Sequence, residues 1–532
     1  MLSLSLSAQL TVKGTPLSFD LDLEAGTCDE PIVLPVSQYV NEDEAQSEGL
    51  NPLLVGVSIP FHKDVDQCGE WHQTAEGDLI WRLTVEAPEA AALSVVFTKF
   101  RLPDNAFLYL YDEMGTEVVG AISSLNNNEN DIMSTSFVKG DRMTIELNII
   151  QPQSYDLLLE IGEIVYHYPT IYGGDLPGAH LRSVPAAGKC FVGVNCMPEG
   201  ERWRKQKRGI VLMKFRENGK WYYCSGSLLN NTNQDGAPLF LTAHHCGAET
   251  SAIDKSLASF TFNYEYVDCE ATTHAESQSL VGCEMLSSAS IDGGTDFMLV
   301  RLNSRPTKEM RPYYNGWDRS EIMPSSGVAI HHPSGDEKTI STFTSKLTYV
   351  TAMIDGYTGM KGSFFKVRWS QTVNGHSVTA GGSSGGALFN AAGYVVGSLS
   401  GGGSSCVSTY SSDYFGCFDR HWEANGGQTS AKSRILSVWL DPLDLGVKRL
   451  SGYDPYPVAL DDSTAEQNIR CWSISNGLMI HCQKDSAPGA LYSMDGRLLK
   501  TFILEQGDNF VPLVEHQAYV IHVGVESRTV IF

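Results

Sequence analysis

The chain has 532 residues, of which 62 are Asp or Glu and 38 are Lys or Arg, so its formal net charge is -24. A field of this sign repels nucleic-acid phosphates and anionic lipids, and we expect neither as a partner. Hydrophobic residues make up 42% and charged residues 19%, which excludes a disordered chain. The length predicts roughly three or four domains. No apolar run reaches the ~20 residues of a membrane-spanning helix, so we expect no membrane span.

The chain begins with MLSLSLSAQLTVKG, a short apolar run with small residues that lacks the basic start of a signal peptide. We interpret residues 1–27 as a truncated leader or N-terminal arm, with an ordinary first strand as the alternative.

From about residue 50 to 165, apolar and polar residues alternate in short runs such as LIWRLTVEA and LSVVFTKF. A period of two with Asp, Asn and Gly between the runs predicts β-strands. We therefore expect an N-terminal β-rich domain over residues 28–182. The segment 166–189 is rich in Gly and Pro, which indicates a linker that proteases could cut.

Short β runs such as GIVLMKF and FMLVRL continue between Gly-rich turns over the next expected domain, residues 183–455. This pattern is typical of a barrel or sandwich. A small β unit, predicted as a β-sandwich, is expected over residues 456–532, where MDGR between apolar runs indicates a hairpin. The predicted fold class of the whole chain is all-β.

Three separated stretches of the 183–455 domain carry the parts of a hydrolytic site. LTAHHCG places two histidines before Cys246, GGTDFMLVRL places Asp296 at the start of a strand, and TAGGSSGGALFN places serines among glycines. Nucleophilic hydrolysis needs a nucleophile, a base, a group that orients the base, and donors for the oxyanion. The order His, Asp, Ser is that of the chymotrypsin-type triad. Together these stretches predict such a site.

On these motifs this part of the chain resembles a trypsin-like serine protease, and more closely the secreted bacterial lysyl endopeptidases. The resemblance implies a central double β-barrel. It makes His245 the base, Asp296 the residue that orients it, and Ser384 the nucleophile. The backbone N–H groups of Gly382 and Ser384 would form the oxyanion hole. Ser383 is the competing nucleophile, but only Ser384 has a glycine two residues before it and two glycines after it.

The neighbouring His244 is expected to contribute packing or surface polarity, because the template needs one base. Zinc is disfavoured, since helical zinc motifs place two histidines one turn apart rather than side by side. We expect no metal and no organic cofactor. The pair His331 and His332 in GVAIHHPSG also resembles the family sequence, and we assign it no catalytic role.

One departure from the trypsin pattern concerns activation. Trypsin-type zymogens have Asp just before the nucleophile, whereas this chain has Ser383, so an ion pair with a freed N-terminus is not expected. We expect instead an inhibitory or folding pro-segment that is removed by cutting at Arg182 or Lys189. The alternative is that the N-terminal domain stays attached as a binding module.

A second departure concerns the substrate pocket. Trypsin has its pocket Asp six residues before the nucleophile, where this chain has Val378. The resemblance instead makes Asp413, in SSDYFGCF, the pocket acid, with the SLSGGG run of residues 398–403 as the pocket wall. A buried carboxylate suits a substrate ammonium, and the family favours Lys over Arg. An ordinary loop residue is the alternative for Asp413.

The 12 cysteines form no close CxxC pair, which indicates disulfides and an oxidising compartment rather than zinc sites. The resemblance implies three pairs: Cys224 with Cys246, Cys190 with Cys406, and Cys196 with Cys269. Elimination leaves Cys283 with Cys417. Pairs within the flanking domains would be Cys28 with Cys68 and Cys471 with Cys482, although sequence alone does not fix connectivity.

The C-terminal segment resembles the sorting domains of the type IX secretion route of Bacteroidetes, through LYSMDGRLLKT, GDNFVPL, AYVIHVG and RTVIF. The alternative is an accessory β-sandwich with a binding function. The sorting interpretation implies a secreted or cell-surface protein that passes through an oxidising periplasm.

These observations predict a secreted, monomeric serine endopeptidase that cleaves proteins or peptides after basic residues, Lys above all, through an acyl-enzyme. One rival is an inactive protease homologue that acts as a surface adhesin or binding protein, which the intact triad disfavours. Another is a hydrolase of non-peptide esters, which the acidic residue Asp413 disfavours.

Overall fold

Strands provide nearly all the regular structure of the chain. The computed structural model describes residues 14–21, 31–41, 52–152, 156–168, 190–271, 273–423, 435–456, 469–474, 477–493, 498–513, 518–523 and 526–531. Within these ranges the longest helix, α2 (Ala252–Leu257), has six residues. The predicted all-β class is confirmed. The chain divides into two units, Met1–Tyr456 and Pro457–Phe532.

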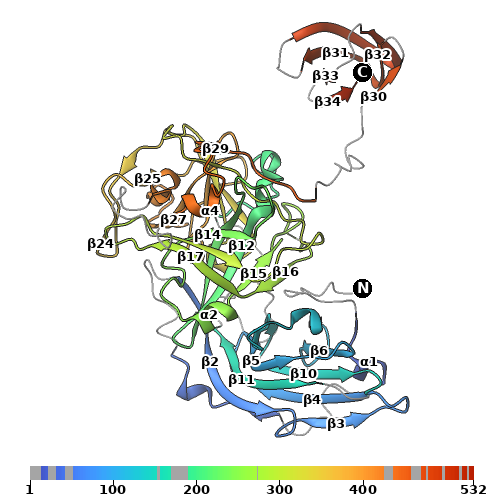
Figure 1. The fold of residues 1–532 in the computed structure, drawn as a ribbon, viewed down its shortest axis with the longest axis vertical. Helices are drawn as coiled ribbons and strands as arrows, with labels where there is room; N and C mark the ends of the chain where they lie inside the picture. Colours follow the sequence, from blue (N-terminus) through green and yellow to red (C-terminus); the bar gives the residue numbers. More distant parts are fainter. Residues whose placement is uncertain are drawn as a thin grey trace. The chain divides into compact units, whose positions relative to one another are not determined.

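The N-terminal part of the first unit contains a six-stranded sheet. Its strands are β1 (Ile32–Val33), β3 (Glu70–Gln73), β4 (Leu79–Glu86), β6 (Ala106–Tyr111), β7 (Val118–Ile122) and β10 (Arg142–Ile149). Figure 1 shows β3, β4, β10 and β6 side by side in that order, and each neighbouring pair is antiparallel.

A second group of strands faces this sheet across a large apolar core. It comprises β2 (Leu53–Asp64), β5 (Ala92–Arg101), β8 (Met133–Ser134), β9 (Val138–Lys139) and β11 (Leu158–His167). The core between the two groups includes the fully buried Trp81, Phe97 and Phe100. Alternate residues of each strand supply this core, as the period of two in the sequence predicts.

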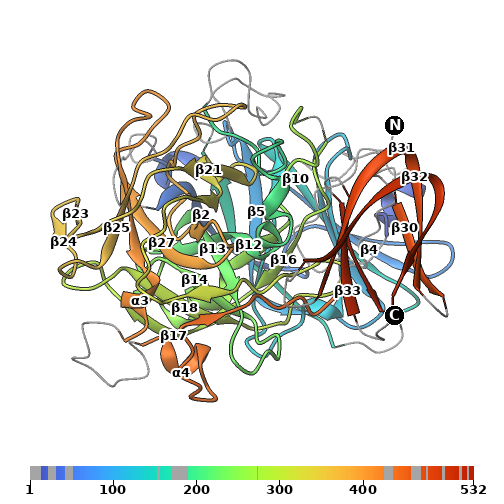
Figure 2. The ribbon, with the colours of Figure 1, turned by 90° about the horizontal axis from the view of Figure 1, so that it is seen from above.

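Seven antiparallel strands follow and surround a second core. They are β12 (Ile210–Glu217), β13 (Lys220–Leu229), β14 (Leu239–Thr242), β15 (Ser259–Phe262), β16 (Gln278–Val281), β17 (Cys283–Ala289) and β18 (Phe297–Leu302). Their order is β16-β15-β12-β13-β14-β18-β17. Figure 2 shows β14, β18 and β17 side by side. Phe215, Phe240 and Phe260 are at most 2% exposed and lie in the core.

The first unit also contains a nine-stranded sheet and a two-stranded pair, β23 (Met353–Ile354) with β24 (Tyr357–Thr358). The strands of the nine-stranded sheet are β19 (Trp317–Asp318), β20 (Gly327–His331), β21 (Thr339–Phe343), β22 (Tyr349–Val350), β25 (Phe364–Val367), β26 (Ala387–Asn390), β27 (Val395–Gly402), β28 (Asp413–Cys417) and β29 (Arg449–Leu450). Its own core includes Phe365, Leu388 and Phe415. A further apolar cluster, which includes Phe297 of β18 and Phe389 of β26, joins the nine-stranded sheet to the seven-stranded sheet. Chain segments that leave the two sheets therefore meet at the boundary between them.

Strand β2 belongs to both halves of the first unit. On one side it pairs with β11 from Gly56 to Asp64, and on the other with β13 from Leu53 to Val57. A mixed apolar cluster lies behind this junction, with Val55 from the N-terminal half and Trp221 from the following sheet. The N-terminal half of the first unit is therefore continuous with the following sheet through backbone hydrogen bonds.

Side-chain hydrogen bonds reinforce the same junction. The Nζ of buried Lys214 donates to the backbone oxygen of Thr135 at 3.0 Å. Trp221 Nε1 donates to Ser58 Oγ, also at 3.0 Å. Because these donors are buried, separating the two halves without water entry would leave them unsatisfied.

The second unit is one five-stranded antiparallel sheet. Its strands are β30 (Ile469–Ile474), β31 (Gly477–Ser493), β32 (Leu498–Pro512), β33 (Ala518–Val523) and β34 (Glu526–Ile531). Strands β31 and β32 pair on either side of residues 494–497, as the predicted hairpin requires. A small core includes Leu478, Leu504 and Ile521.

The predicted Cys283–Cys417 disulfide is wrong, since both cysteines are free and buried. Cys283 packs in the core of the seven-stranded sheet and Cys417 in that of the nine-stranded sheet, so the two thiols lie in different cores. The predicted Cys28–Cys68 disulfide is also wrong, since Cys68 is free and its thiol donates to the backbone oxygen of Asp64 at 3.4 Å.

Several other predictions fall outside the described residues. They concern Cys28, Arg182, Lys189 and most of the predicted leader, of which only residues 14–21, with the short helix α1 (Leu17–Asp20), are described; the side chains of Cys471 and Cys482 are likewise not described. Among the described residues, no helix combines the length and apolar character needed to cross a membrane.

Candidate active site

His245 lies in a tight turn after β14. The turn is closed by a hydrogen bond from the backbone N–H of Cys246 to the oxygen of Ala243 at 3.2 Å. The disulfide between Cys246 and Cys224 of β13 holds it from the other side. The His245 side chain is 15% exposed. A buried strand, a turn and a disulfide thus fix the position of the imidazole.

Asp296 stands immediately before β18 and is fully buried. Its Oδ2 lies 3.0 Å from His245 Nδ1, and its Oδ1 accepts the backbone N–H of His245 at 3.3 Å. Burial alone would raise the pKa of Asp296, but the charge of His245 and its hydrogen bond outweigh burial and lower it. The carboxylate therefore stays ionised beside the imidazole.

Ser384 lies in the turn that precedes β26, and it is 8% exposed. Gly382, in this turn, has φ +85°, and a Cβ there would lie 2.8 Å from the backbone nitrogen of Gly335. Only glycine fits this conformation and this close approach. Among the described residues, no hydrogen bond from the backbone N–H of Gly382 or Ser384 is found, so both are available to an oxyanion.

The turn that carries Ser384 is held against the turn that carries His245. The backbone N–H of Ser225 donates to the oxygen of Ser384 at 2.7 Å. A Cβ on Gly385 would lie 2.8 Å from the backbone nitrogen of Ala243, two residues before His245. His245 Nε2 is buried and has no hydrogen-bond partner in the described part of the chain, which leaves this atom open to a nucleophile. A hydrogen bond between a catalytic base and its nucleophile often tightens only when substrate binds.

Asp413 begins β28 and is fully buried. Its Oδ2 accepts hydrogen bonds from Trp369 Nε1 at 2.6 Å, Thr379 Oγ1 at 2.8 Å and Ser404 Oγ at 2.5 Å. Its Oδ1 accepts the backbone N–H of Ser404 at 3.1 Å. Burial raises the pKa of Asp413, and these hydrogen bonds offset burial only in part. A cation bound beside it would lower this pKa.

The two carboxylate oxygens of Asp413 differ in their surroundings. Three side-chain donors occupy Oδ2, whereas Oδ1 accepts one hydrogen bond within the described ranges. A Cβ on Gly402 of β27 would lie 2.3 Å from Oδ1 and 2.5 Å from Asp413 Cα, so only glycine allows β27 to approach Asp413 this closely. Val378, at the position of the trypsin acid, is buried in the core.

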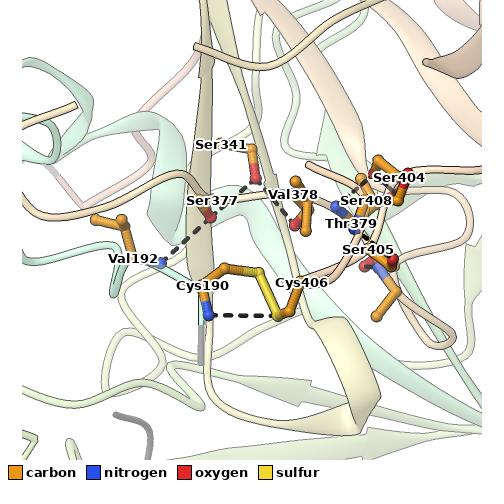
Figure 3. The surroundings of a disulfide bond; sticks show 12 residues. Cys190, Val192, Ser341, Ser377, Val378, Thr379, Ser404, Ser405, Cys406 and Ser408 are labelled. Atoms are coloured by element: carbon orange, nitrogen blue, oxygen red, sulfur yellow. Dashed lines mark hydrogen bonds between the residues drawn. A yellow bond between two sulfur atoms is a disulfide. The ribbon is translucent and has the colours of Figure 1, made fainter. Parts of the chain in front are cut away.

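Figure 3 shows the disulfide that ties Cys190 to Cys406, with Thr379 and Ser404 close by. The backbone N–H of Cys190 also lies 3.3 Å from Cys406 Sγ. This disulfide, Cys196–Cys269 and Cys224–Cys246 are the three pairs that the family resemblance implies. They fit an oxidising environment.

The residues behind Asp296 could not be predicted from the sequence. His421 is fully buried, with Nδ1 2.9 Å from Thr295 Oγ1 and Nε2 3.1 Å from Ser398 Oγ. Burial lowers the pKa of His421 to about 3, so the imidazole is neutral. It links the residue before Asp296 to β27. Its sequence context, CFDRH, contains no motif that announces this role.

His244, the neighbour of His245, contacts Glu249, with Nε2 3.1 Å from Oε1. Burial lowers the pKa of His244. Within the described residues, no group of three or more His, Cys, Asp or Glu side chains could hold a metal ion.

Comparison with known proteins adds two findings. Residues 184–416 match the family model described as lysyl endopeptidase, C-terminal domain. The lysyl endopeptidase of Pseudomonas aeruginosa is 29% identical over 391 residues, which cover 69% of this chain and 79% of that protein. These matches identify the chain as a serine endopeptidase. Among such enzymes, its sequence is similar to the lysyl endopeptidases in particular.

Solved structures of serine proteases are more distant. The thermostable serine protease AL20, from an extremophilic microorganism, is 17% identical with a TM-score of 0.28, covering 40% of this chain and 92% of that one. The protease Anisep from Arthrobacter nicotinovorans is also 17% identical with a TM-score of 0.28, covering 40% and 91%.

Proposed function

We propose that the chain hydrolyses peptide bonds on the carboxyl side of lysine. The observation that carries this specificity is the buried carboxylate of Asp413, with one oxygen held by three side chains and the other accepting one backbone N–H among the described residues. An ammonium group that enters there replaces its lost hydration with charge-assisted hydrogen bonds. An apolar side chain would leave the carboxylate without a counter-charge.

The proposed chemistry starts at Ser384. His245 Nε2 takes the hydroxyl proton while Ser384 Oγ bonds to the carbonyl carbon, and the carbonyl π electrons move to oxygen. The N–H groups of Gly382 and Ser384 stabilise this oxyanion. Asp296 holds Nδ1–H of His245 and stabilises the imidazolium that forms.

Collapse of the tetrahedral intermediate breaks the C–N bond. His245 gives its proton to the departing amine, and an ester between Ser384 and the substrate remains. Water then attacks the ester by the same steps, with His245 first taking a proton from water and then returning it to Ser384. The products are two peptides, the first ending in lysine.

Matched peptides with Lys, Arg or Leu before the cleaved bond test this proposal. They are incubated with the processed protein and with its Ser384→Ala and Asp413→Asn variants. Rapid cleavage after Lys that Ser384→Ala abolishes, with a loss of Lys preference in Asp413→Asn, is expected. Absence of cleavage by the processed protein would exclude the enzyme mechanism. An unchanged Lys preference in Asp413→Asn would exclude this residue as the pocket acid.

We further propose that the N-terminal domain restrains the enzyme until it is removed. Leu53, at the start of β2, lies against the oxyanion turn: a Cβ on Gly381 would be 3.3 Å from Leu53 Cδ1, and one on Gly382 would be 3.5 Å from Cδ2. The backbone of Leu53 pairs with Tyr223, the residue before Cys224. A substrate chain that extended past the oxyanion hole on this side would meet β2.

A chain with Arg182 and Lys189 both changed to Ala tests this restraint. If the domain restrains the enzyme, this chain cleaves a Lys peptide more slowly than processed protein from which the N-terminal half has been separated. Equal rates for the two forms would instead favour a domain that stays attached for binding.

We also propose secretion for the chain, in keeping with its disulfides, and a sorting role for residues 456–532. Comparing export of the chain with and without that segment tests both.

A further inference from the structure

The residue before the nucleophile has a defined partner of its own. Ser383 is fully buried. Its Oγ accepts the backbone N–H of Ala380 at 3.1 Å and lies 2.8 Å from His331 Nδ1. Its backbone N–H donates to the oxygen of Ala380, and its own oxygen accepts the N–H of Gly386. Ser383 therefore closes the turn that carries both oxyanion-hole N–H groups.

His331 connects this turn to three other segments of the chain. It ends β20 and is 1% exposed. Its Nε2 lies 3.0 Å from Ser341 Oγ of β21, and Ser341 Oγ lies 3.0 Å from Ser377 Oγ. Ser377 Oγ accepts the backbone N–H of Val192 at 3.2 Å. Figure 3 shows the part of this chain of hydrogen bonds from Ser341 to Val192, beside the disulfide of Cys190.

The protons in this network can be assigned. Burial lowers the pKa of His331 to about 3, so the ring has one donor and one acceptor. Ser341 Oγ donates to the backbone oxygen of Val378 at 3.2 Å, and it therefore accepts from His331 Nε2–H. Nδ1 is then bare and accepts the hydroxyl proton of Ser383. In this tautomer every polar side-chain atom of the network has a partner, as buried polar groups require.

We propose that His331 is the positioning residue of the oxyanion hole: through Ser383 it holds the turn that aims the N–H groups of Gly382 and Ser384. The network contains no ion pair. It needs no freed N-terminus, because the segment at Val192 joins it through a backbone N–H that exists before and after any cut. This inference rests on the proposed role of Ser384 as the nucleophile.

Two substitutions at one position separate the two ring nitrogens of His331. The amide of asparagine reaches about as far as Nδ1 and can keep the bond to Ser383, whereas the amide of glutamine reaches about as far as Nε2 and keeps only the bond to Ser341. We expect His331→Gln to lower kcat on a Lys peptide about 10- to 100-fold with little change in KM, because losing one oxyanion donor outright costs about 10²- to 10³-fold. His331→Asn is expected to recover most of this loss.

Inhibitor binding shows whether the effect lies in the oxyanion hole. A peptide ending in lysine aldehyde forms a tetrahedral adduct that uses the hole, whereas the same peptide ending in lysine carboxamide does not. His331→Gln should weaken aldehyde binding about 10- to 100-fold and carboxamide binding less than threefold. Equal weakening of both inhibitors, no weakening of either, or equal losses in the Gln and Asn variants would overturn the proposal.

Two further variants keep the test decisive. If His331→Gln does not fold, Ser383→Ala removes a single oxygen from the same network and should shift the two inhibitors in the same unequal way. Ser384→Ala separates the two proposals. If Ser384→Ala cleaves like the wild type, the proposed function fails and this inference fails with it. If Ser384→Ala is inactive but Ser383→Ala binds the aldehyde as tightly as the wild type, only this inference fails.

Discussion

Asp296 holds His245 at two points: its Oδ2 lies 3.0 Å from the ring Nδ1, and its Oδ1 accepts the backbone N–H at 3.3 Å. The first contact selects the tautomer with a proton on Nδ1 and a bare Nε2. The second fixes the main chain from which the ring extends. One carboxylate therefore sets both the protonation and the position of the proposed base.

Changing Asp296 to Asn should lower kcat on a Lys peptide about 10⁴-fold at neutral pH, with KM changed less than about twofold. The amide can donate to Nδ1, and the ring would then carry its proton on Nε2, where it cannot accept one from Ser384. Steady-state kinetics measures the effect, with the unfolding midpoint as a control for folding. A loss confined to KM would contradict the assigned role.

Changing Gly402 to Ala should impair use of Lys substrates, because the new methyl group would lie 2.3 Å from Asp413 Oδ1. A Cβ there would also lie 2.5 Å from Asp413 Cα, so Asp413 must shift. We expect kcat/KM for a Lys peptide to fall at least about 10-fold, because the substrate ammonium then loses its counter-charge. Gly403→Ala is the matched control, since a Cβ there meets Ser411 Cβ at 3.6 Å, an ordinary contact. Similar losses in both variants would contradict this geometry.

Alkylation tests directly whether Cys283 and Cys417 are free thiols. Both are buried, and burial raises the pKa of Cys283 to about 12, so neither should react with iodoacetamide in the native protein. In denaturant without a reductant both should become alkylated, whereas Cys224 and Cys246 should not. Mass spectrometry of tryptic peptides measures the alkylation of each cysteine. If Cys283 stayed unmodified after denaturation, the predicted disulfide to Cys417 would be supported again.

The raised pKa of Glu337 predicts how the free energy of unfolding changes with pH. Burial raises its pKa from 4.5 to about 7, and the side chain is 8% exposed and 3.3 Å from His274 Nδ1. Because the folded state binds this proton more tightly, the stability it contributes is fully present below pH 4.5 and is lost as pH rises through 7. The loss is at most about 3 kcal/mol.

Urea unfolding at pH 5 and pH 8, in a Ser384→Ala background that prevents self-digestion, measures this contribution. Glu337→Gln should lose less stability than its parent between the two pH values. Exposed Glu284 provides the control, since Glu284→Gln should follow the parent. The same pH dependence in all three proteins would show that Glu337 does not titrate as described.

Local sequence signals located the triad candidates because each sits in its own short motif. The turn glycines around Ser384 and the cysteine after His245 are needed within a few residues of the functional group, so they appear beside it in the sequence. The strand pattern likewise follows from alternation, because each strand buries one face.

Other features depend on contacts between distant segments. Trp369, Thr379 and Ser404 reach Asp413 from separate parts of the chain, and His331 meets Ser383 across 52 residues. The residues that flank such a hydroxyl or imidazole group in the sequence form no motif that reveals the contact. The Cys283–Cys417 prediction failed for a related reason: elimination assumed that every cysteine pairs, whereas a buried thiol can pack as a small apolar side chain.

Because β2 pairs with both β11 and β13, cutting the chain and releasing its N-terminal half are two separate events. Hydrolysis between Tyr168 and Cys190 would break one covalent bond and none of the hydrogen bonds that join β2 to β13. The N-terminal half would then persist as the second chain of a noncovalent complex. If this half restrains the enzyme as proposed, activity would appear only as the complex dissociated, after a lag set by its lifetime. Dilution would leave that lifetime unchanged but slow rebinding, so the local concentration as well as proteolysis would control how much enzyme is active.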